Sequence, residues 1–163
     1  MKSNRILWVV LTLCVLVLVV SWTQGNFAPK KKLPAQPASA AALKLKRIAW
    51  QPSFESALQL SRKSGKPVMI AFHADWCGVC KDMDAKVYPQ RPVILESVNF
   101  ISVKVDSDAR QDLANKYRVN ALPAILWMRG DGSVIDRVDG YADADELVQM
   151  MRSAIVNAPP PTI

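Results

Sequence analysis

Cysteine and histidine are scarce in this 163-residue chain, which has three cysteines and one histidine. A structural zinc site normally takes four Cys or His ligands, and only Cys77 and Cys80 form a closely spaced pair. Covalent attachment of a c-type haem requires a histidine directly after the second cysteine, and Lys81 stands there. The third cysteine, Cys14, lies in an apolar run. These absences disfavour a metal site and exclude covalent haem, and we expect no cofactor.

Acidic residues are absent from the first 50 positions, which hold eight Lys and Arg residues. Residues 51–163 hold 13 basic and 14 acidic residues, so the net charge of +7 comes from the amino-terminal segment. The rest of the chain lacks the basic excess typical of nucleic-acid-binding domains, and we expect no nucleic-acid partner. Lys30, Lys31 and Lys32 are candidates for contact with anionic lipid head groups or for a solvated tether.

An uncharged apolar run covers residues 6–20 and follows Lys2 and Arg5, a pattern typical of a signal peptide or a signal anchor. Extended to residues 6–22, it is short against the usual span of about 20 residues but lies within the range of about 17–25 that crosses a bilayer. No A-x-A-like cleavage site follows, which favours an uncleaved anchor over a removed signal. We therefore expect residues 1–25 to form a signal-anchor with one transmembrane helix.

The orientation of this anchor is not fixed by charge alone, because basic residues flank the apolar run on both sides. An apolar amino-terminal segment preceded by basic residues is typical of export. We expect a single-pass protein of the bacterial inner membrane whose domain faces the periplasm or another extracytoplasmic side.

The remaining chain divides into three parts. Residues 26–49, rich in Pro, Ala and Lys, predict a linker, and residues 158–163 predict a flexible tail. Residues 50–157 predict one α/β domain, since apolar periodicity and turn residues alternate there. The patterns indicate helices over 53–64, 78–87, 93–98, 109–117 and from 143 onward, and strands over 67–73, 100–106, 124–129 and 133–138. Ser53 and Gly65 are the expected caps of the first helix. A βαβ half followed by a ββα half predicts a mixed sheet with helices on both faces.

The pair Cys77 and Cys80 falls at the predicted junction of a buried strand and a helix. A purely structural disulfide is the alternative, but a bridge between residues three apart closes a short loop and constrains little of the unfolded chain. At a helix N-terminus, unpaired N–H groups and the helix dipole favour a thiolate, which is the attacking species in disulfide exchange. The second cysteine, one turn further on, is placed to resolve a mixed disulfide. The spacing and position indicate redox chemistry.

Several motifs within residues 68–150 resemble the thioredoxin superfamily. They are W-C-x-x-C-K over residues 76–81, a strand ending in Val105-Asp106, and the segment Tyr117-x-Val119-x-x-Leu122-Pro123. The fragments FHADWCGVCK and ALPAILWM are most similar to the carboxy-terminal thioredoxin-like domain of bacterial transmembrane thiol:disulfide interchange proteins. The resemblance implies a thioredoxin-like fold whose domain exchanges electrons with partner proteins outside the cytoplasm.

The resemblance also implies roles for individual residues. Cys77 would be the catalytic nucleophile and Cys80 the resolving thiol, the two forming a redox-active disulfide. Pro123 matches the cis-proline of the family, whose loop binds the partner backbone, and we expect Leu122 and Trp76 to contact substrate as well. The alternatives are an ordinary turn proline at Pro123 and simple packing of Trp76.

The sequence departs from the family at a buried acid–base pair. Ala71 stands where thioredoxins place a buried aspartate, and an alignment on Asp106 puts Ser102 where they place a buried lysine, so the pair is expected to be missing. Asp84, one helical turn after Cys80, is our candidate catalytic proton acceptor for that thiol. The alternative is a solvent-facing aspartate like Asp82. His73 is a candidate either for tuning Cys77 or for packing against the active-site loop.

The combined features predict a membrane-anchored thiol:disulfide oxidoreductase that exchanges electrons with exported, disulfide-containing proteins. The apolar Gly78-Val79 between the cysteines and the negative charges of Asp75 and Asp84 favour a reducing direction. An exported reductase needs a separate membrane electron donor as a second partner. The alternative function is a non-enzymatic thioredoxin-fold binding or assembly module at the membrane.

Overall fold

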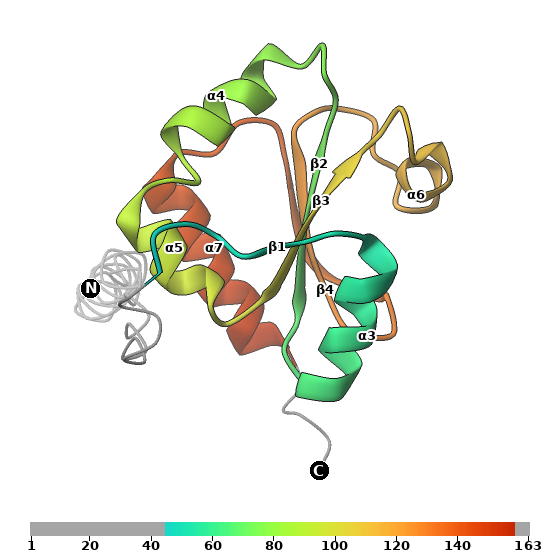
Figure 1. Cartoon of the computed structure of the whole chain (residues 1–163), viewed down its shortest axis with the longest axis vertical. Coiled ribbons are helices and arrows are strands. Elements are labelled where there is room, and N and C mark those ends of the chain that lie inside the picture. The colour runs from blue at the N-terminus through green and yellow to red at the C-terminus, as the bar shows by residue number, and fades with distance from the viewer. Residues whose placement is uncertain (1–44, 159–163) are drawn as a thin grey trace, which may run out of the picture. The chain divides into compact units, whose positions relative to one another are not determined.

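The computed structural model describes residues 45–158, which form a five-stranded sheet flanked by helices (Figure 1). The strands stand in the order β1-β3-β2-β4-β5, with bounds Trp50–Gln51 (β1), Val68–His73 (β2), Ile101–Asp106 (β3), Ala124–Met128 (β4) and Val134–Asp139 (β5). The helices are Phe54–Ser64 (α3), Gly78–Lys86 (α4), Arg91–Ser97 (α5), Gln111–Lys116 (α6) and Ala144–Asn157 (α7). None of these helices is long and apolar enough to cross a bilayer; the expected transmembrane segment lies outside the described residues.

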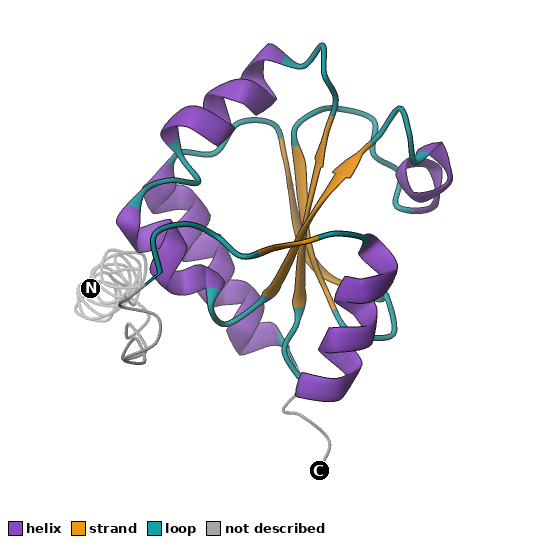
Figure 2. Cartoon of the chain, viewed as in Figure 1, coloured by secondary structure: helices purple, strands orange, loops and turns teal. Residues whose placement is uncertain are grey.

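The central strand β2 organises two apolar layers. It pairs in parallel with β3 and antiparallel with β4, and its side chains point alternately to the two faces of the sheet. Val68, Ile70 and Phe72 join one core cluster with residues of α3 and α6, whereas Met69 and Ala71 join the other with residues of α4, α5 and α7. Figure 2 shows the helices on the two sides of the sheet. The predicted mixed sheet with helices on both faces is confirmed.

The caps of α3 show how local sequence sets the helix bounds. The Ser56 N–H donates to Ser53 Oγ at 3.1 Å, and the Ser53 N–H donates to Ser56 Oγ at 3.3 Å, so the two form a reciprocal capping box. Gly65 ends the helix with φ of 72°, a left-handed conformation that favours glycine, and its N–H donates to the Ser61 carbonyl. The prediction of Ser53 and Gly65 as the two caps is confirmed.

Strand β1 is absent from the predicted order of elements. Its two residues pair in parallel with β3, Trp50 opposite Ser102 and Gln51 opposite Val103. A two-residue strand is too short to show an alternating pattern, so only its pairing with β3 defines it. The hydrophobic core already includes a residue just before this strand. Ile48 is 3% exposed and belongs to the core cluster that α5 and α7 cover.

A partly buried ion pair links α5 to α7. Arg152 donates from Nε to Glu96 Oε1 at 2.7 Å and from Nη2 to the same oxygen at 2.6 Å, while the Glu96 side chain is 8% exposed. Asn99 Nδ2 lies 3.4 Å from the other carboxylate oxygen. Removal of the arginine would leave a buried carboxylate with one long hydrogen bond.

We therefore expect Arg152→Met to lower the free energy of unfolding by about 2–3 kcal/mol, below the full cost of breaking a buried pair because Arg152 keeps some solvent contact. Urea denaturation of the full chain measures the difference. Lys86→Met is the control, because Lys86 pairs with Asp82 on the exposed surface of α4, and we expect almost no change there. Equal losses in the two variants would contradict a stabilising role for the buried pair.

Candidate redox site

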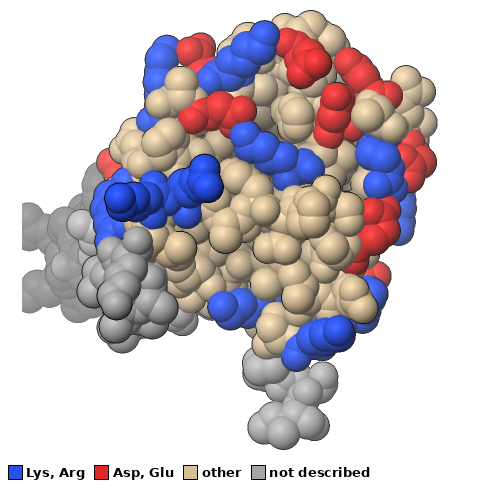
Figure 3. Space-filling model, viewed as in Figure 1, with Lys and Arg blue, Asp and Glu red and all other residues tan. Residues whose placement is uncertain are grey.

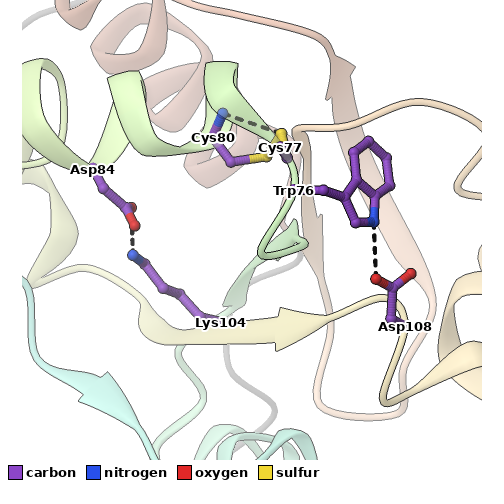
Figure 4. The surroundings of a disulfide bond; sticks show 6 residues. All are labelled: Trp76, Cys77, Cys80, Asp84, Lys104 and Asp108. Atoms are coloured by element: carbon purple, nitrogen blue, oxygen red, sulfur yellow. Dashed lines mark hydrogen bonds and ion pairs between the residues drawn. A yellow bond between two sulfur atoms is a disulfide. The ribbon is translucent and has the colours of Figure 1, made fainter.

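Cys77 and Cys80 lie where β2 passes into α4, and a disulfide joins them (Figure 4). Cys77 is the N-cap of α4, and the Cys80 N–H lies 3.1 Å from Cys77 Sγ. The backbone turns into the helix through a hydrogen bond from the Cys77 N–H to the Ala74 carbonyl at 3.0 Å. The predicted placement of both cysteines at a strand-to-helix junction is confirmed.

This position suits Cys77 for nucleophilic attack. After reduction its sulfur would lie at the amino end of α4, where backbone N–H groups without a helical partner and the helix dipole stabilise a thiolate. The Cys80 N–H already points at that sulfur in the disulfide form. Each cysteine is 5% exposed, so position on the helix rather than exposure distinguishes their roles.

Trp76 is the most exposed large apolar residue beside the disulfide. It is 71% exposed, and its Nε1 donates to Asp108 Oδ2 at 2.9 Å (Figure 4). Asp108 is held in turn by its own N–H, which donates to Asp106 Oδ1 at 2.9 Å. Val79, also on the rim, is 44% exposed. Exposed apolar side chains next to a disulfide suit contact with a protein partner, and the binding role of Trp76 stays a prediction.

Pro123 lies in a loop that meets the cysteines. The peptide bond between Leu122 and Pro123 is cis, as the resemblance implied. Leu122 packs against the small apolar cluster formed by Ala74, Cys77 and Cys80. The Pro123 carbonyl accepts a hydrogen bond from the Gly140 N–H at 2.7 Å, which ties this loop to the end of β5. The structure therefore brings the predicted residues Leu122 and Pro123 together with both cysteines.

The strand register places a lysine beside Ala71. In the pairing of β2 with β3, Ala71 stands opposite Lys104, whereas Ser102 stands opposite Met69. Side chains two residues apart on a strand point to the same face, so the alternating pattern of β3 alone does not decide whether Ser102 or Lys104 stands opposite Ala71. Lys104, which the sequence analysis did not single out, is therefore the lysine that stands opposite Ala71.

Asp84 lies on α4 and points toward β3, where it forms an ion pair with the Lys104 ammonium (Figure 4). Both residues line a small pocket with Cys80, Ala71 and Pro123; its other lining residues are Phe72, His73 and Tyr88. Asp84 and Cys80 thus line the same pocket from α4, one helical turn apart. Its role as proton acceptor stays a prediction.

Asp82 behaves differently from Asp84 although only two residues separate them. It pairs with Lys86 on its own helix at 2.6 Å, and the hydrogen bond with Asp82 raises the pKa of Lys86. Because Asp82 is paired within α4 and does not line the pocket, it is a suitable control for experiments on Asp84.

Tyr88 closes the pocket from the segment after α4. Burial, with a smaller contribution from the negative charge of Asp84, raises the pKa of Tyr88 well above its usual value. The phenol therefore stays neutral at physiological pH, so its ring can attract a cation without forming an ion pair.

Charged side chains of both signs surround this end of the molecule. Figure 3 shows Lys and Arg side chains interspersed with Asp and Glu side chains over the upper part of the visible face, where α4 lies in Figure 1. A mixed surface of this kind differs from the continuous basic surface of a nucleic-acid-binding domain.

A mixed sheet, a disulfide at the start of a helix and an adjacent cis-proline together define a thioredoxin fold. The chain belongs to the family described as thioredoxin-like domain, which matches residues 54–155. It is 36% identical over 92 residues to mitochondrial thioredoxin of Bos taurus, covering 56% of this chain and 54% of that protein. It is 32% identical over 102 residues to thiol:disulfide interchange protein DsbD of Pseudomonas fluorescens, covering 58% and 17%. The chain thus spans less than two thirds of the length of either relative.

Solved structures agree with this assignment. A thioredoxin from Thermus thermophilus superposes with a TM-score of 0.62 at 26% identity, covering 69% of this chain and 90% of that one. The carboxy-terminal domain of Neisseria meningitidis DsbD in its oxidised form superposes with a TM-score of 0.54 at 28% identity, covering 74% and 99%. The resemblance stated from the sequence motifs, to thioredoxins and to DsbD-type domains, is confirmed.

Proposed function

We propose that this protein is a thiol:disulfide oxidoreductase that cycles between the Cys77–Cys80 disulfide and the corresponding dithiol. The observation that carries the proposal is the disulfide at the amino end of α4, packed against Leu122 of the cis-proline loop and next to the exposed Trp76. A structural disulfide would gain little from such a short loop and would not need an exposed apolar rim.

In the reducing direction the Cys77 thiolate attacks one sulfur of a substrate disulfide. A mixed disulfide forms, and the first substrate sulfur leaves as a thiolate. The Cys80 thiolate then attacks Cys77 Sγ, which breaks the mixed disulfide and releases the second substrate thiolate. Two electrons pass from the cysteine pair to the substrate, and the Cys77–Cys80 disulfide is the oxidised product.

Asp84 and Lys104 are placed to assist the second step. We assign to Asp84 the role of accepting the proton of the Cys80 thiol, and to Lys104 that of offsetting the negative charge that develops in the pocket. The carboxylate comes from α4 rather than from β2, where Ala71 cannot supply it. In this proposal Asp84 and Lys104 together take the part of the missing acid–base pair.

The insulin disulfide assay tests the activity itself. We expect the full chain to accelerate the reduction of insulin by dithiothreitol, and prior alkylation of the reduced protein to remove the acceleration. A rate no higher than that of dithiothreitol alone would refute the oxidoreductase proposal and leave a binding or assembly module as the function.

We further propose that the protein is anchored in a bacterial inner membrane through residues 6–22, with its domain on the extracytoplasmic side and working in the reducing direction. The apolar run after Lys2 and Arg5 supports the anchor, and the apolar Gly78-Val79 between the cysteines supports the direction. Its substrates are then exported proteins with disulfides, and a separate membrane protein supplies its electrons.

Fusion of alkaline phosphatase after Ile163 tests the location, because this enzyme becomes active only when it is exported. We expect an active fusion that sediments with membranes and resists extraction by high salt. A cytoplasmic, inactive fusion would contradict the export proposal, and a soluble, shortened product would identify residues 1–25 as a cleaved signal.

A further inference from the structure

The ammonium of Lys104 lies among three groups that each attract a cation. It pairs with the Asp84 carboxylate, and it lies 5.2 Å from the centre of the Trp50 ring and 5.4 Å from that of the Tyr88 ring. The two rings meet edge to face, with centres 5.3 Å apart and an interplanar angle of 75°. Three elements of the chain therefore converge on one lysine head group.

Strand pairing explains how Trp50 reaches this position. Trp50 stands opposite Ser102 in the β1–β3 ladder, and Lys104 follows two residues later on the same face of the sheet. An aromatic side chain reaches such a diagonal neighbour on an adjacent strand. The short strand β1 thus places the Trp50 ring over the lysine. The second ring is that of Tyr88, the residue after the C-cap of α4.

Without neighbours, a lysine ammonium on its flexible four-carbon stem samples many positions. The Lys104 side chain is still 27% exposed, so water competes for its head group. Two aromatic rings favour the position of the ammonium beside Asp84 over fully hydrated alternatives. Tyr88 is only 7% exposed, so the packed surroundings fix the position of its ring beside the ammonium.

We propose that Trp50 and Tyr88 form an aromatic clamp that positions Lys104 in the Cys80 pocket and thereby speeds resolution of the mixed disulfide. The inference rests on the proposed function. In this step the Cys80 proton passes to the Asp84 carboxylate, the Cys80–Cys77 bond forms, the Cys77–substrate bond breaks, and the substrate sulfur leaves as a thiolate. The clamped ammonium offsets the negative charge that Cys80 acquires.

Trp50 and Tyr88 are positioning residues, because they act through Lys104. The charged and titratable side chains that line the pocket are Asp84 from α4, His73 from β2, Tyr88 and Lys104 itself. Loss of the ammonium leaves the thiolate less stabilised, so formation of the thiolate then needs a higher pH.

The two steps can be followed with Ellman's reagent and the reduced full chain carrying Cys14→Ser, because Cys77 attack then releases the first thionitrobenzoate and Cys80 attack releases the second. We expect Trp50→Leu to slow the second release about two- to five-fold, the range set by one cation–π contact. Trp50→Phe should retain most of the rate, and the first release should be unchanged in both. The pH–rate profile of the second release should move to higher pH in Trp50→Leu.

A double-mutant cycle separates the clamp from ordinary packing. We expect Lys104→Met to slow the second release at least as much as Trp50→Leu, and Trp50→Leu to add no further loss when Lys104 is already Met. Lys116→Met is the matched control. The Lys116 ammonium, at the end of α6, lies 5.2 Å from the centre of the Tyr117 ring, which packs on the other face of the sheet. This change should leave both releases unchanged.

An unchanged second release in Trp50→Leu, or an equal loss from Trp50→Leu with and without Lys104, would overturn the clamp. Thermal unfolding of each variant checks that it is folded, and Trp50→Phe and Lys104→Met keep the test decisive if Trp50→Leu is unstable. A wild-type chain that gives no release at all would refute the proposed function. An active wild type whose second release is not slowed by Trp50→Leu would refute the clamp alone.

Discussion

Replacing Cys77 with serine is expected to reduce insulin reduction by the full chain to the rate of dithiothreitol alone. A serine hydroxyl remains protonated at neutral pH, whereas the N-cap position of Cys77 is one that favours a thiolate, the attacking species. Cys80 cannot take over the first attack, because it lies within the first turn of the helix rather than at its N-cap. The loss should therefore be complete within the sensitivity of the assay.

Two further variants serve as controls for the Cys77→Ser prediction. Cys14→Ser should leave the turnover unchanged, because we assign Cys14 to the membrane anchor and not to the redox pair. Cys80→Ser should still allow the first attack by Cys77 but should stop at a mixed disulfide. Turnover at the wild-type rate in Cys77→Ser would show that another group is the nucleophile.

Asp84→Asn is expected to slow the resolution step by roughly 10², the low end for loss of a general base. An amide cannot accept the Cys80 proton, so that proton must pass to solvent instead. The low end applies because thiols need less help than alcohols, and because Lys104, freed of its ion pair, can still stabilise the Cys80 thiolate. The first attack by Cys77 should change less.

Asp82→Asn is the matched control for this change, because Asp82 pairs with Lys86 within the same helix and does not line the pocket. Stopped-flow measurement of the two releases from Ellman's reagent separates the steps. Asp84→Asn should slow the second release much more than the first, while Asp82→Asn should affect neither. If the two variants gave the same rates, Asp84 would be a surface charge without a part in proton transfer.

The elements that position the cysteines could be predicted because each carries a complete local pattern. The run at residues 67–73 is apolar up to its last residue, His73, which suits a strand buried on both faces. Ser53 and Gly65 mark the ends of α3 by their own capping chemistry. The Cys-x-x-Cys pair and Pro123 were identified from motifs. These features depend on a few consecutive residues, and the structure confirms each of them.

The parts of the site that were missed depend on contacts between distant segments. Lys104 and Ser102 point to the same face of β3, and only the register with β2 decides which one stands opposite Ala71. Asp108 contacts Trp76 from 32 positions along the chain. Trp50 belongs to a two-residue strand without any periodic pattern. In each case pairing or packing, and not local sequence, determines the position.

Residues identified from motifs and residues placed by packing belong to different steps of the proposed chemistry. The motifs identify the sulfur atoms that exchange electrons, but the groups that surround Cys80 come from α4, β3 and the segment after α4. In the proposed clamp, Trp50 of β1 positions Lys104 beside Asp84. Variants of Asp84, Lys104 and Trp50 should alter the second step of the cycle while the first is largely preserved.

Trapping of mixed disulfides tests the central claim most directly. The full chain with Cys80→Ala would be expressed in bacteria, treated with acid and an alkylating agent, and separated without reductant. We predict covalent adducts with exported proteins that disappear on reduction, linked through Cys77 by mass spectrometry, and their absence from a Cys77→Ala variant. Adducts of equal yield through Cys80 in Cys77→Ala, or no adducts in either variant, would contradict the assignment of Cys77 as nucleophile and Cys80 as resolving thiol.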